Sequence, residues 1–276
     1  MKFKQKISGL LTIILVASCA TNPFTGSQTM ALVSNDQLFP TSFQQYNQVL
    51  AENSVISGTS QSEMIKRVGQ RIAVSAERWL NANGYQGYLD GYKWEYNLIE
   101  SEQVNAWCMP GGKIAFYTGI LPIAENETAI AAIMGHEVAH ALANHGQQRM
   151  SAAYIQQGIA LAGNVLIEDN QTRDIFNQSY GIGSQVGVML PFSRSHETEA
   201  DKIGLILMAV AGYNPEEAAN LWRRMDANSG GQAPPEFLST HPANASRIEN
   251  LTNLVPQANS EAKKFGVTDY RPLGKY

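Results

Sequence analysis

The sequence predicts an α+β fold that is predominantly helical, with a small sheet next to one central helix. Three observations lead to this prediction. Residues 62–80 repeat apolar residues at three- and four-residue steps, as amphipathic helices do. Two short stretches, 93–99 and 105–118, instead show the alternation or the turn residues of strands. A His-Glu-x-x-His run from His136 to His140 follows them within an apolar stretch.

The composition is that of an ordinary globular chain. The 276 residues are 44% hydrophobic, which leaves room for a sizeable core. The net charge of −4 comes from acidic and basic residues that are intermixed. No basic stripe of the kind that binds nucleic acid is present in the sequence, so nucleic acid is not expected as a partner.

The first residues predict a lipoprotein-type signal peptide over 1–18. Three lysines precede a short apolar run, and Val16-Ala17-Ser18 places small residues ahead of Cys19. This ending is similar to a bacterial lipobox, in which Cys19 is lipidated and becomes the first mature residue. An ordinary signal peptide or an N-terminal membrane anchor is the alternative, although the apolar run is short for a membrane span.

Ala20 stands where an aspartate would retain a lipoprotein in the inner membrane. By resemblance to lipoproteins of Gram-negative bacteria, we expect an outer membrane lipoprotein that faces the periplasm. The membrane would then be a partner through the lipid anchor at Cys19. Residues 20–40 are rich in polar residues and proline, which predicts a lipidated N-terminal tether over 19–45.

The elements that precede the His-Glu-x-x-His run are a long helical stretch and two strand regions. Residues 41–80 predict helix, and residues 93–99 predict a strand. Residues 105–118 form two extended runs around Pro110-Gly111-Gly112, which predicts a hairpin. Such a sheet could present an edge strand to an extended peptide, and a purely structural hairpin is the alternative. Residues 151–190 contain no apolar run of spanning length and are expected to pack on the protein or to form a flap.

The two cysteines predict no internal disulfide. Once Cys19 is acylated, Cys108 is the only free thiol left in the chain. A catalytic role for Cys108 would require a histidine partner, and none neighbours it in the sequence. We therefore interpret Cys108 as a structural residue.

The His-Glu-x-x-His run predicts a zinc site. Residues four apart on an α-helix differ by about 40° around its axis, so His136 and His140 project side by side and can hold one zinc ion. Glu137 lies next to them and can take a proton from the attacking water. Thr128 is the expected N-cap of this helix. The alternative is a helix that carries two histidines without a metal.

A second cluster, around residues 196–201, offers the third ligand. Glu197 and Asp201 are four apart and share a helix face. Glu197 would leave one zinc position open, and Asp201 would accept a hydrogen bond from a zinc histidine. The alternative is a solvated acidic first turn, which we expect of Glu199. His196 is a competing ligand candidate, whereas His145 has the wrong spacing for a ligand.

The pattern His136-Glu137-x-x-His140 with Glu197-x-x-Ala200-Asp201 resembles the gluzincin peptidase family that includes the HtpX heat-shock protease, the CAAX prenyl protease, LoiP and BepA. The likeness covers about residues 60–255, and the lipobox fits the LoiP-like periplasmic lipoprotein members best. The resemblance implies a zincin-type catalytic domain, expected over 46–256, with a C-terminal tail over 257–276. Asn105-Ala106 resembles the family's substrate-binding strand segment.

These observations predict a zinc-dependent metalloendopeptidase with one Zn²⁺ per chain. His136, His140 and Glu197 would bind the metal, and Glu137 would be general base and then proton donor to the leaving amine. By the family likeness, the substrates are expected to be misfolded or damaged envelope proteins. The rival interpretation is a non-enzymatic zinc-containing lipoprotein with a chaperone or holding role. The sequence does not specify an oligomeric state.

His241 has three possible roles. Ser239-Thr240-His241-Pro242 with Arg247-Ile248 resembles the family's C-terminal motif and follows a Gly/Pro-rich stretch at 230–235. As a fourth zinc ligand, His241 would complete a structural site or, as the resemblance to BepA suggests, hold the enzyme latent. Swung aside, it would stabilise the oxyanion. It could also be a surface histidine that caps the next helix. We favour the latch, because a Gly/Pro loop is a poor support for a preorganised donor.

Overall fold

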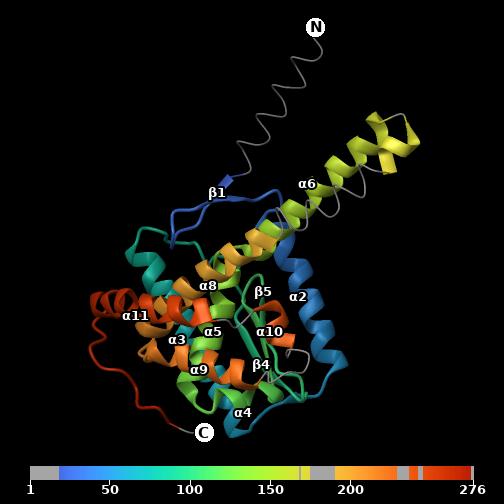
Figure 1. The fold of residues 1–276 in the computed structure, drawn as a ribbon. Helices are drawn as coiled ribbons and strands as arrows, with labels where there is room; N and C mark the ends of the chain where they lie inside the picture. Colours follow the sequence, from blue (N-terminus) through green and yellow to red (C-terminus); the bar gives the residue numbers. More distant parts are fainter. Residues whose placement is uncertain (1–18, 168, 175–189, 229–235, 242–244, 275–276) are drawn as a thin grey trace.

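The computed structural model describes residues 19–167, 169–174, 190–228, 236–241 and 245–274. Helices dominate this part of the chain, and one small mixed sheet lies beside the central helix α5 (Glu127–Leu142) (Figure 1). The predicted fold class is therefore confirmed.

The sheet has four strands in the order β3-β4-β6-β5. They are β3 (Val55–Ile56), β4 (Glu95–Ile99), β6 (Lys113–Tyr117) and β5 (Ala106–Met109). The central pair, β4 and β6, is parallel, and the two outer strands pair antiparallel with them. β5 and β6 form the predicted hairpin. Gly111 and Gly112 turn it with φ angles of 83° and 87°, which residues with a side chain rarely adopt.

The predicted helix over 41–80 is two helices with a strand between them. α2 spans Asn35–Glu52 and α3 spans Ser60–Ala82, and β3 separates them. Each helix begins with a capping box, at Ser34 and at Thr59. These local stop and start signals divide an apolar pattern that is otherwise continuous.

The remaining helices surround α5 or extend from it. After the short turns η1 (Thr118–Ile120) and α4 (Leu121–Ala124), the chain enters α5 and then α6 (His145–Leu166). The C-terminal part contains α8 (Leu190–Val210), α9 (Glu216–Asn228), α10 (Glu236–Thr240) and α11 (Ala245–Lys264). Helix α6 extends away from the body of the molecule (Figure 1). In the range 151–190, residue 168 and residues 175–189 lie outside the described residues, so the expected flap is described only in part.

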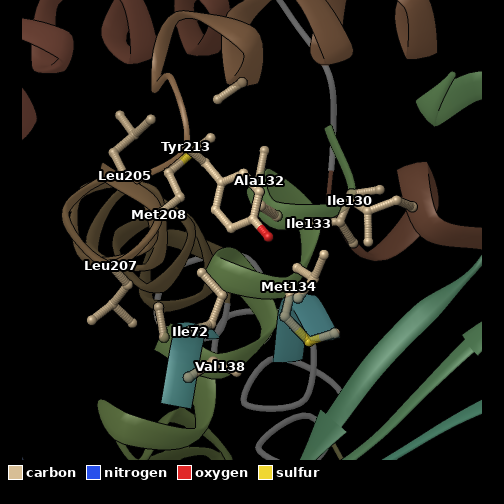
Figure 2. Packing of buried hydrophobic residues seen from close by; sticks show 14 of the residues in the cluster. Ile72, Ile130, Ala132, Ile133, Met134, Val138, Leu205, Leu207, Met208 and Tyr213 are labelled. Atoms are coloured by element: carbon tan, nitrogen blue, oxygen red, sulfur yellow. The ribbon is translucent and has the colours of Figure 1, made fainter. Parts of the chain in front are cut away.

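The core is built around α5, which packs against α3, α8 and α9. Figure 2 shows buried apolar side chains of α3, α5 and α8 in this core. The closest neighbour of α5 is α8, and two glycines allow the approach. A Cβ on Gly135 would lie 2.8 Å from the carbonyl oxygen of Gly204, and a Cβ on Gly204 would lie 2.8 Å from the backbone nitrogen of His136. This contact holds the His-Glu-x-x-His turn of α5 against the middle of α8. The N-cap of α5 is Asn126, whose Oδ1 accepts from Ala129 N, and the prediction of Thr128 as the cap is wrong.

The N-terminal segment that was predicted to be a tether contains ordered elements. β1 (Cys19–Thr21) pairs with β2 (Gln28–Met30), and together they form an N-terminal hairpin over 19–30. Phe24, at its turn, stacks on Trp79 of α3 with ring centroids 4.3 Å apart. The predicted domain boundaries stay a prediction, although those after residues 45 and 256 fall within α2 and α11. Within the part of the chain that the structure describes, no helix has both the length and the apolar character for a membrane crossing.

Candidate metal centre

Four side chains from three segments bring donor atoms together in one cluster. His136 and His140 come from α5, Glu197 comes from α8, and His241 directly follows α10. Their donor atoms all lie within 4.8 Å of one another. The structure therefore brings together the three predicted ligands and the predicted fourth candidate.

The donor set fits a zinc ion. The Nε2 atoms of His136 and His140 are 3.1 Å apart, and each lies 3.3 Å from an oxygen of Glu197. His241 Nδ1 lies 3.1 Å from His136 Nε2. Donors that surround a tetrahedral zinc at bond lengths of about 2.0–2.1 Å are separated by about 3.3 Å, and imidazole and carboxylate are ordinary zinc ligands. The cluster thus matches zinc in both chemistry and spacing.

His136 is supported directly by Asp201, as the sequence predicted. Its Nδ1 lies 2.9 Å from Asp201 Oδ1, and both side chains are 5% exposed. Burial opposes protonation of the imidazole, but hydrogen bonds to Asp201 and Glu197 outweigh it and raise the pKa of His136 to about 9. The carboxylates around His136 therefore favour positive charge at this point, as a cation site requires.

Arg247 completes this side of the cluster, and sequence reasoning gave it no role. Its guanidinium donates to both oxygens of Asp201, at 2.7 and 2.9 Å, and its Nη1 lies 3.1 Å from Glu197 Oε2. The guanidinium also stands 3.7 Å from the ring centroid of Trp222. Arg247 thus fixes both carboxylates in place. Its place in a C-terminal motif was the only signal for it.

His140 is supported through a second histidine. Its Nδ1 lies 2.9 Å from His145 Nδ1, and His145 Nε2 lies 2.8 Å from Glu199 Oε2. His145 is fully buried, and it is not among the four clustered donors, in agreement with the prediction that it is not a ligand. His145 does not continue the helix that carries His140, because α5 ends at Leu142 and Asn144 turns the chain with a φ angle of 55°.

The expectation that Glu199 belongs to a solvated first turn is wrong. α8 begins at Leu190, so Glu199 lies near its middle, and its side chain is only 14% exposed. Burial raises the pKa of a carboxyl, but here hydrogen bonds from His145 and Thr25 outweigh it and lower the pKa of Glu199 to about 2. His196 lies outside the four-donor cluster, because its ring stacks on His145 with centroids 4.0 Å apart.

Glu137, the predicted base, lies beside the cluster and is 5% exposed. Among the described residues, its Oε1 is a buried oxygen without a hydrogen-bond partner, and His241 Nε2 stands 3.5 Å away. Burial raises the pKa of Glu137 from the ordinary value of a glutamate. A buried carboxylate oxygen of this kind can accept a proton from a water at the cluster.

The predicted substrate residues lie at the edge strand β5, which packs beside α5. Tyr117 N donates to Asn105 O at 3.1 Å, so the alternation of an antiparallel ladder turns the backbone groups of Ala106 and Cys108 toward the free edge. The side-chain oxygen of Asn105 already accepts from Ala106 N, at 2.9 Å. Burial raises the pKa of the Cys108 thiol, which is consistent with a structural role.

The chain belongs to peptidase family M48, whose family model matches residues 59–255. This family and the names of the relatives below confirm the predicted enzyme class, a zinc metalloendopeptidase. Mitochondrial metalloendopeptidase OMA1 of Saccharomyces cerevisiae is 36% identical over 195 residues, which is 68% of this chain and 54% of that protein. The human metalloendopeptidase OMA1 is 31% identical and covers 60% of this chain and 33% of its own length.

A relative of BepA type is also found, whereas a particular closeness to LoiP is not confirmed. The beta-barrel assembly-enhancing protease of Yersinia pestis is 24% identical over 267 residues, 92% of this chain and 52% of that protein. The chain thus spans about half the length of the first relatives that it matches.

The predicted location in a Gram-negative outer membrane is contradicted by the comparisons. The relatives at 31–36% identity are named as mitochondrial proteins. Residues 1–18, which include Val16-Ala17-Ser18 of the lipobox-like sequence, lie outside the described residues, whereas Cys19 and Ala20 lie in β1. Lipidation of Cys19, the first residue of β1, stays a prediction.

Proposed function

We propose that this chain is an endopeptidase for unfolded or damaged proteins, with His136, His140 and Glu197 as zinc ligands and Glu137 as the general base. The observation that carries the proposal is the buried, unpartnered Oε1 of Glu137 beside the four-donor cluster, among the residues that the structure describes. A structural metal site gives no reason to bury a carboxylate oxygen in this way, because an unsatisfied buried polar atom costs free energy.

The residues around the cluster divide the reaction between them. When bound, zinc would act as a Lewis acid on the scissile carbonyl and make water more acidic. Glu137 accepts a proton from the attacking water and then donates it to the leaving amine. Burial raises the pKa of Glu137, so this carboxylate accepts a proton more readily than an exposed glutamate does.

The edge of β5 is the proposed binding surface for an extended substrate. A peptide that pairs with Ala106 and Cys108 would lie alongside α5 and so pass close to the cluster. Asn105 would have to release Ala106 N, because its side chain occupies that edge donor. Pairing through main-chain groups depends little on side chains, which suits a protease for unfolded proteins of varied sequence.

His241 is proposed as a latch that occupies the fourth zinc position in the resting enzyme. Four protein ligands are typical of closed zinc sites, whereas catalytic sites leave one position for water or substrate. Phe237 N donates to Val104 O at 3.1 Å, so α10 is attached to the residue that lies two before β5. A peptide that pairs with β5 would therefore meet α10, and its binding would displace His241 from the cluster.

The four-donor arrangement also supports a second candidate, a zinc-containing protein that holds unfolded chains without cleaving them. Glu137 separates the two functions, because only the peptidase requires it. Glu137→Gln spares all four donors, so zinc content should remain near one per chain while cleavage of an unfolded protein falls by orders of magnitude. The measurement is gel-resolved cleavage of a reduced, unfolded substrate together with metal analysis. Equal cleavage by the variant would refute the proposed base, and zinc binding without cleavage by the wild type would favour the holding function.

A further inference from the structure

The two ring nitrogens of His140 face different partners. Nε2 belongs to the four-donor cluster, where it lies 3.3 Å from Glu197 Oε1. Nδ1 faces away from the cluster and lies 2.9 Å from His145 Nδ1. A histidine that binds a metal through one nitrogen is usually oriented by a hydrogen bond from the other. His145 occupies the place of that orienting group.

Only one arrangement of protons satisfies the whole chain of contacts while His140 Nε2 keeps its lone pair. Glu199 is ionised and accepts from His145 Nε2–H, at 2.8 Å. The neutral His145 ring then has a lone pair on Nδ1, which accepts from His140 Nδ1–H. His140 Nε2 is left without a proton and directed into the cluster. The carboxylate of Glu199 thereby sets the tautomer of His140 without touching it, because His145 lies between them.

The His145 ring is held on several sides. His196 stacks on it with an interplanar angle of 11°, and His196 Nε2 lies 3.1 Å from Gln148 Oε1. Asn144, in the left-handed conformation, places His145 at the start of α6, and its side chain donates to Tyr88 OH. The ring therefore has little freedom to rotate away from His140.

Glu199 is held in turn by the N-terminal hairpin. Its Oε1 accepts hydrogen bonds from Thr25 Oγ1 and, at 3.2 Å, from Ser27 Oγ. Both hydroxyls belong to the turn that Phe24 fastens to Trp79. A segment 174 residues away in sequence thus contacts the far end of the chain that begins at His140.

We propose that His145 and Glu199 are positioning residues for His140, and that the Thr25–Ser27 turn holds Glu199 so that the N-terminal hairpin becomes part of the zinc site. The inference rests on the proposed role of His140 as a ligand. It assigns to the hairpin a function beyond linking the domain to what precedes it: the hairpin tunes metal affinity.

The test measures zinc affinity by competition with a chelating dye, with Zn²⁺ added to the metal-free full chain. His145→Leu removes both ring nitrogens and should weaken zinc binding by about 10–100-fold, the scale for groups that orient a metal ligand. His145→Gln keeps one acceptor and one donor and should stay within a few-fold of the wild type. This rescue separates positioning from packing, because leucine and glutamine fill a similar volume.

The hairpin is tested by the double variant Thr25→Val, Ser27→Ala, which should weaken zinc binding by about 2–10-fold, less than the loss of His145 itself. Thr198→Ala is the matched control, because this exposed hydroxyl lies on α8 beside Glu199 but donates to Arg194 O, so its removal should leave zinc affinity unchanged. If His145→Leu does not fold, the double variant carries the test alone.

Two outcomes would overturn the inference: folded His145→Leu with wild-type affinity, or His145→Gln as weak as His145→Leu. Failure of the proposed function looks different in the same assay. In that case the wild type would not bind one Zn²⁺, or His140→Ala would bind it unchanged.

Discussion

His136 and His140 stand one turn apart on α5, yet their outer nitrogens are held in different ways. His136 Nδ1 meets the buried carboxylate of Asp201, which comes from the same helix as Glu197 and is fixed by Arg247. His140 Nδ1 meets His145, which reaches a carboxylate only through its own second nitrogen. One ligand is supported by the core of the domain. The other is supported by His145 at the start of α6, by Glu199 on α8 and, through Glu199, by the N-terminal hairpin.

The support of His136 is buried and fixed, whereas the support of His140 reaches the surface and can vary. Asp201 and Arg247 are 5% and 7% exposed, and α8 holds Asp201 at a fixed distance from Glu197. The second support ends at Thr25 and Ser27 on the surface of the molecule, where their bonds compete with water. The support of His136 therefore supplies most of the affinity for zinc, and the support of His140 adjusts that affinity.

The largest effect is expected from the ligand that both sides share. Glu197 contacts both histidines, so Glu197→Ala should abolish zinc binding at micromolar metal, a loss greater than the roughly 10–100-fold of any orienting residue. Metal analysis after dialysis measures it. Glu199→Ala, two residues away, is the matched variant and should retain most of its zinc. Retention of zinc by Glu197→Ala would mean that the third ligand lies elsewhere.

The second prediction compares the residue that supports His136 with the carboxylate that supports His140. Asp201→Asn should weaken zinc binding by about 10–100-fold, because an amide is a weaker acceptor for His136 Nδ1–H and no longer balances Arg247. Glu199→Gln should cost less, because its amide oxygen can still accept from His145. Competition with a chelating dye gives both affinities. Equal losses in the two variants would remove the distinction between the core support and the hairpin support.

The sequence predicted the ligands and Asp201 on the His136 side because each pair of them lies within a single helix, either α5 or α8. Spacing of four residues places Glu197 and Asp201 on one face, and the same rule pairs His136 with His140. The predicted hairpin at residues 105–118 rested on Pro110-Gly111-Gly112, whose backbone requirement is equally local. The parallel pairing of β4 with β6 was beyond such rules, since strand order depends on packing.

The His140 side was missed because a helix was assumed to continue. Asn144 breaks it, and a non-glycine residue with positive φ has only a weak sequence signal. Spacing along one continuous helix therefore could not place His145 relative to His140. Glu199 was assigned to a first turn because the start of α8, at Leu190, could not be located. Contacts such as Thr25 with Glu199 join distant segments, and no periodicity within either segment specifies them.

A third prediction loosens the hairpin without touching the metal centre. Phe24→Ala removes the stack on Trp79 and should destabilise the attachment of residues 19–30 by about 3 kcal/mol. Hydrogen exchange should then rise in the hairpin and not in α5. Zinc affinity should fall only a few-fold, because His145 and Glu199 keep their mutual bond. Unchanged exchange in the hairpin would show that the Phe24 stack does not fasten it.

The smallest change in metal binding is expected at His241, which extends the comparison to a third histidine. His136 and His140 each have an outer partner within 2.9 Å, whereas the outer nitrogen of His241 lies 3.5 Å from Glu137 Oε1. Of the three rings it is the one that the described residues orient least, and it follows the short helix α10. A donor with weak outer support is the one that a substrate can displace most easily.

His241→Ala should therefore leave zinc content near one per chain, because the three supported ligands remain. Under the latch, initial rates of cleavage should rise several-fold, since the position that His241 held is open to water and substrate. Under the oxyanion role, kcat should instead fall by about 10²–10³ with little change in KM. Steady-state kinetics on one unfolded substrate separate the two, with Ser239→Ala, an exposed position on α10, as the control. A variant with wild-type kinetics would exclude both roles.

The latch also predicts how cleavage responds to a peptide that pairs with β5. Such a peptide should accelerate cleavage by the wild type and not by His241→Ala, because only the wild type has a histidine to release.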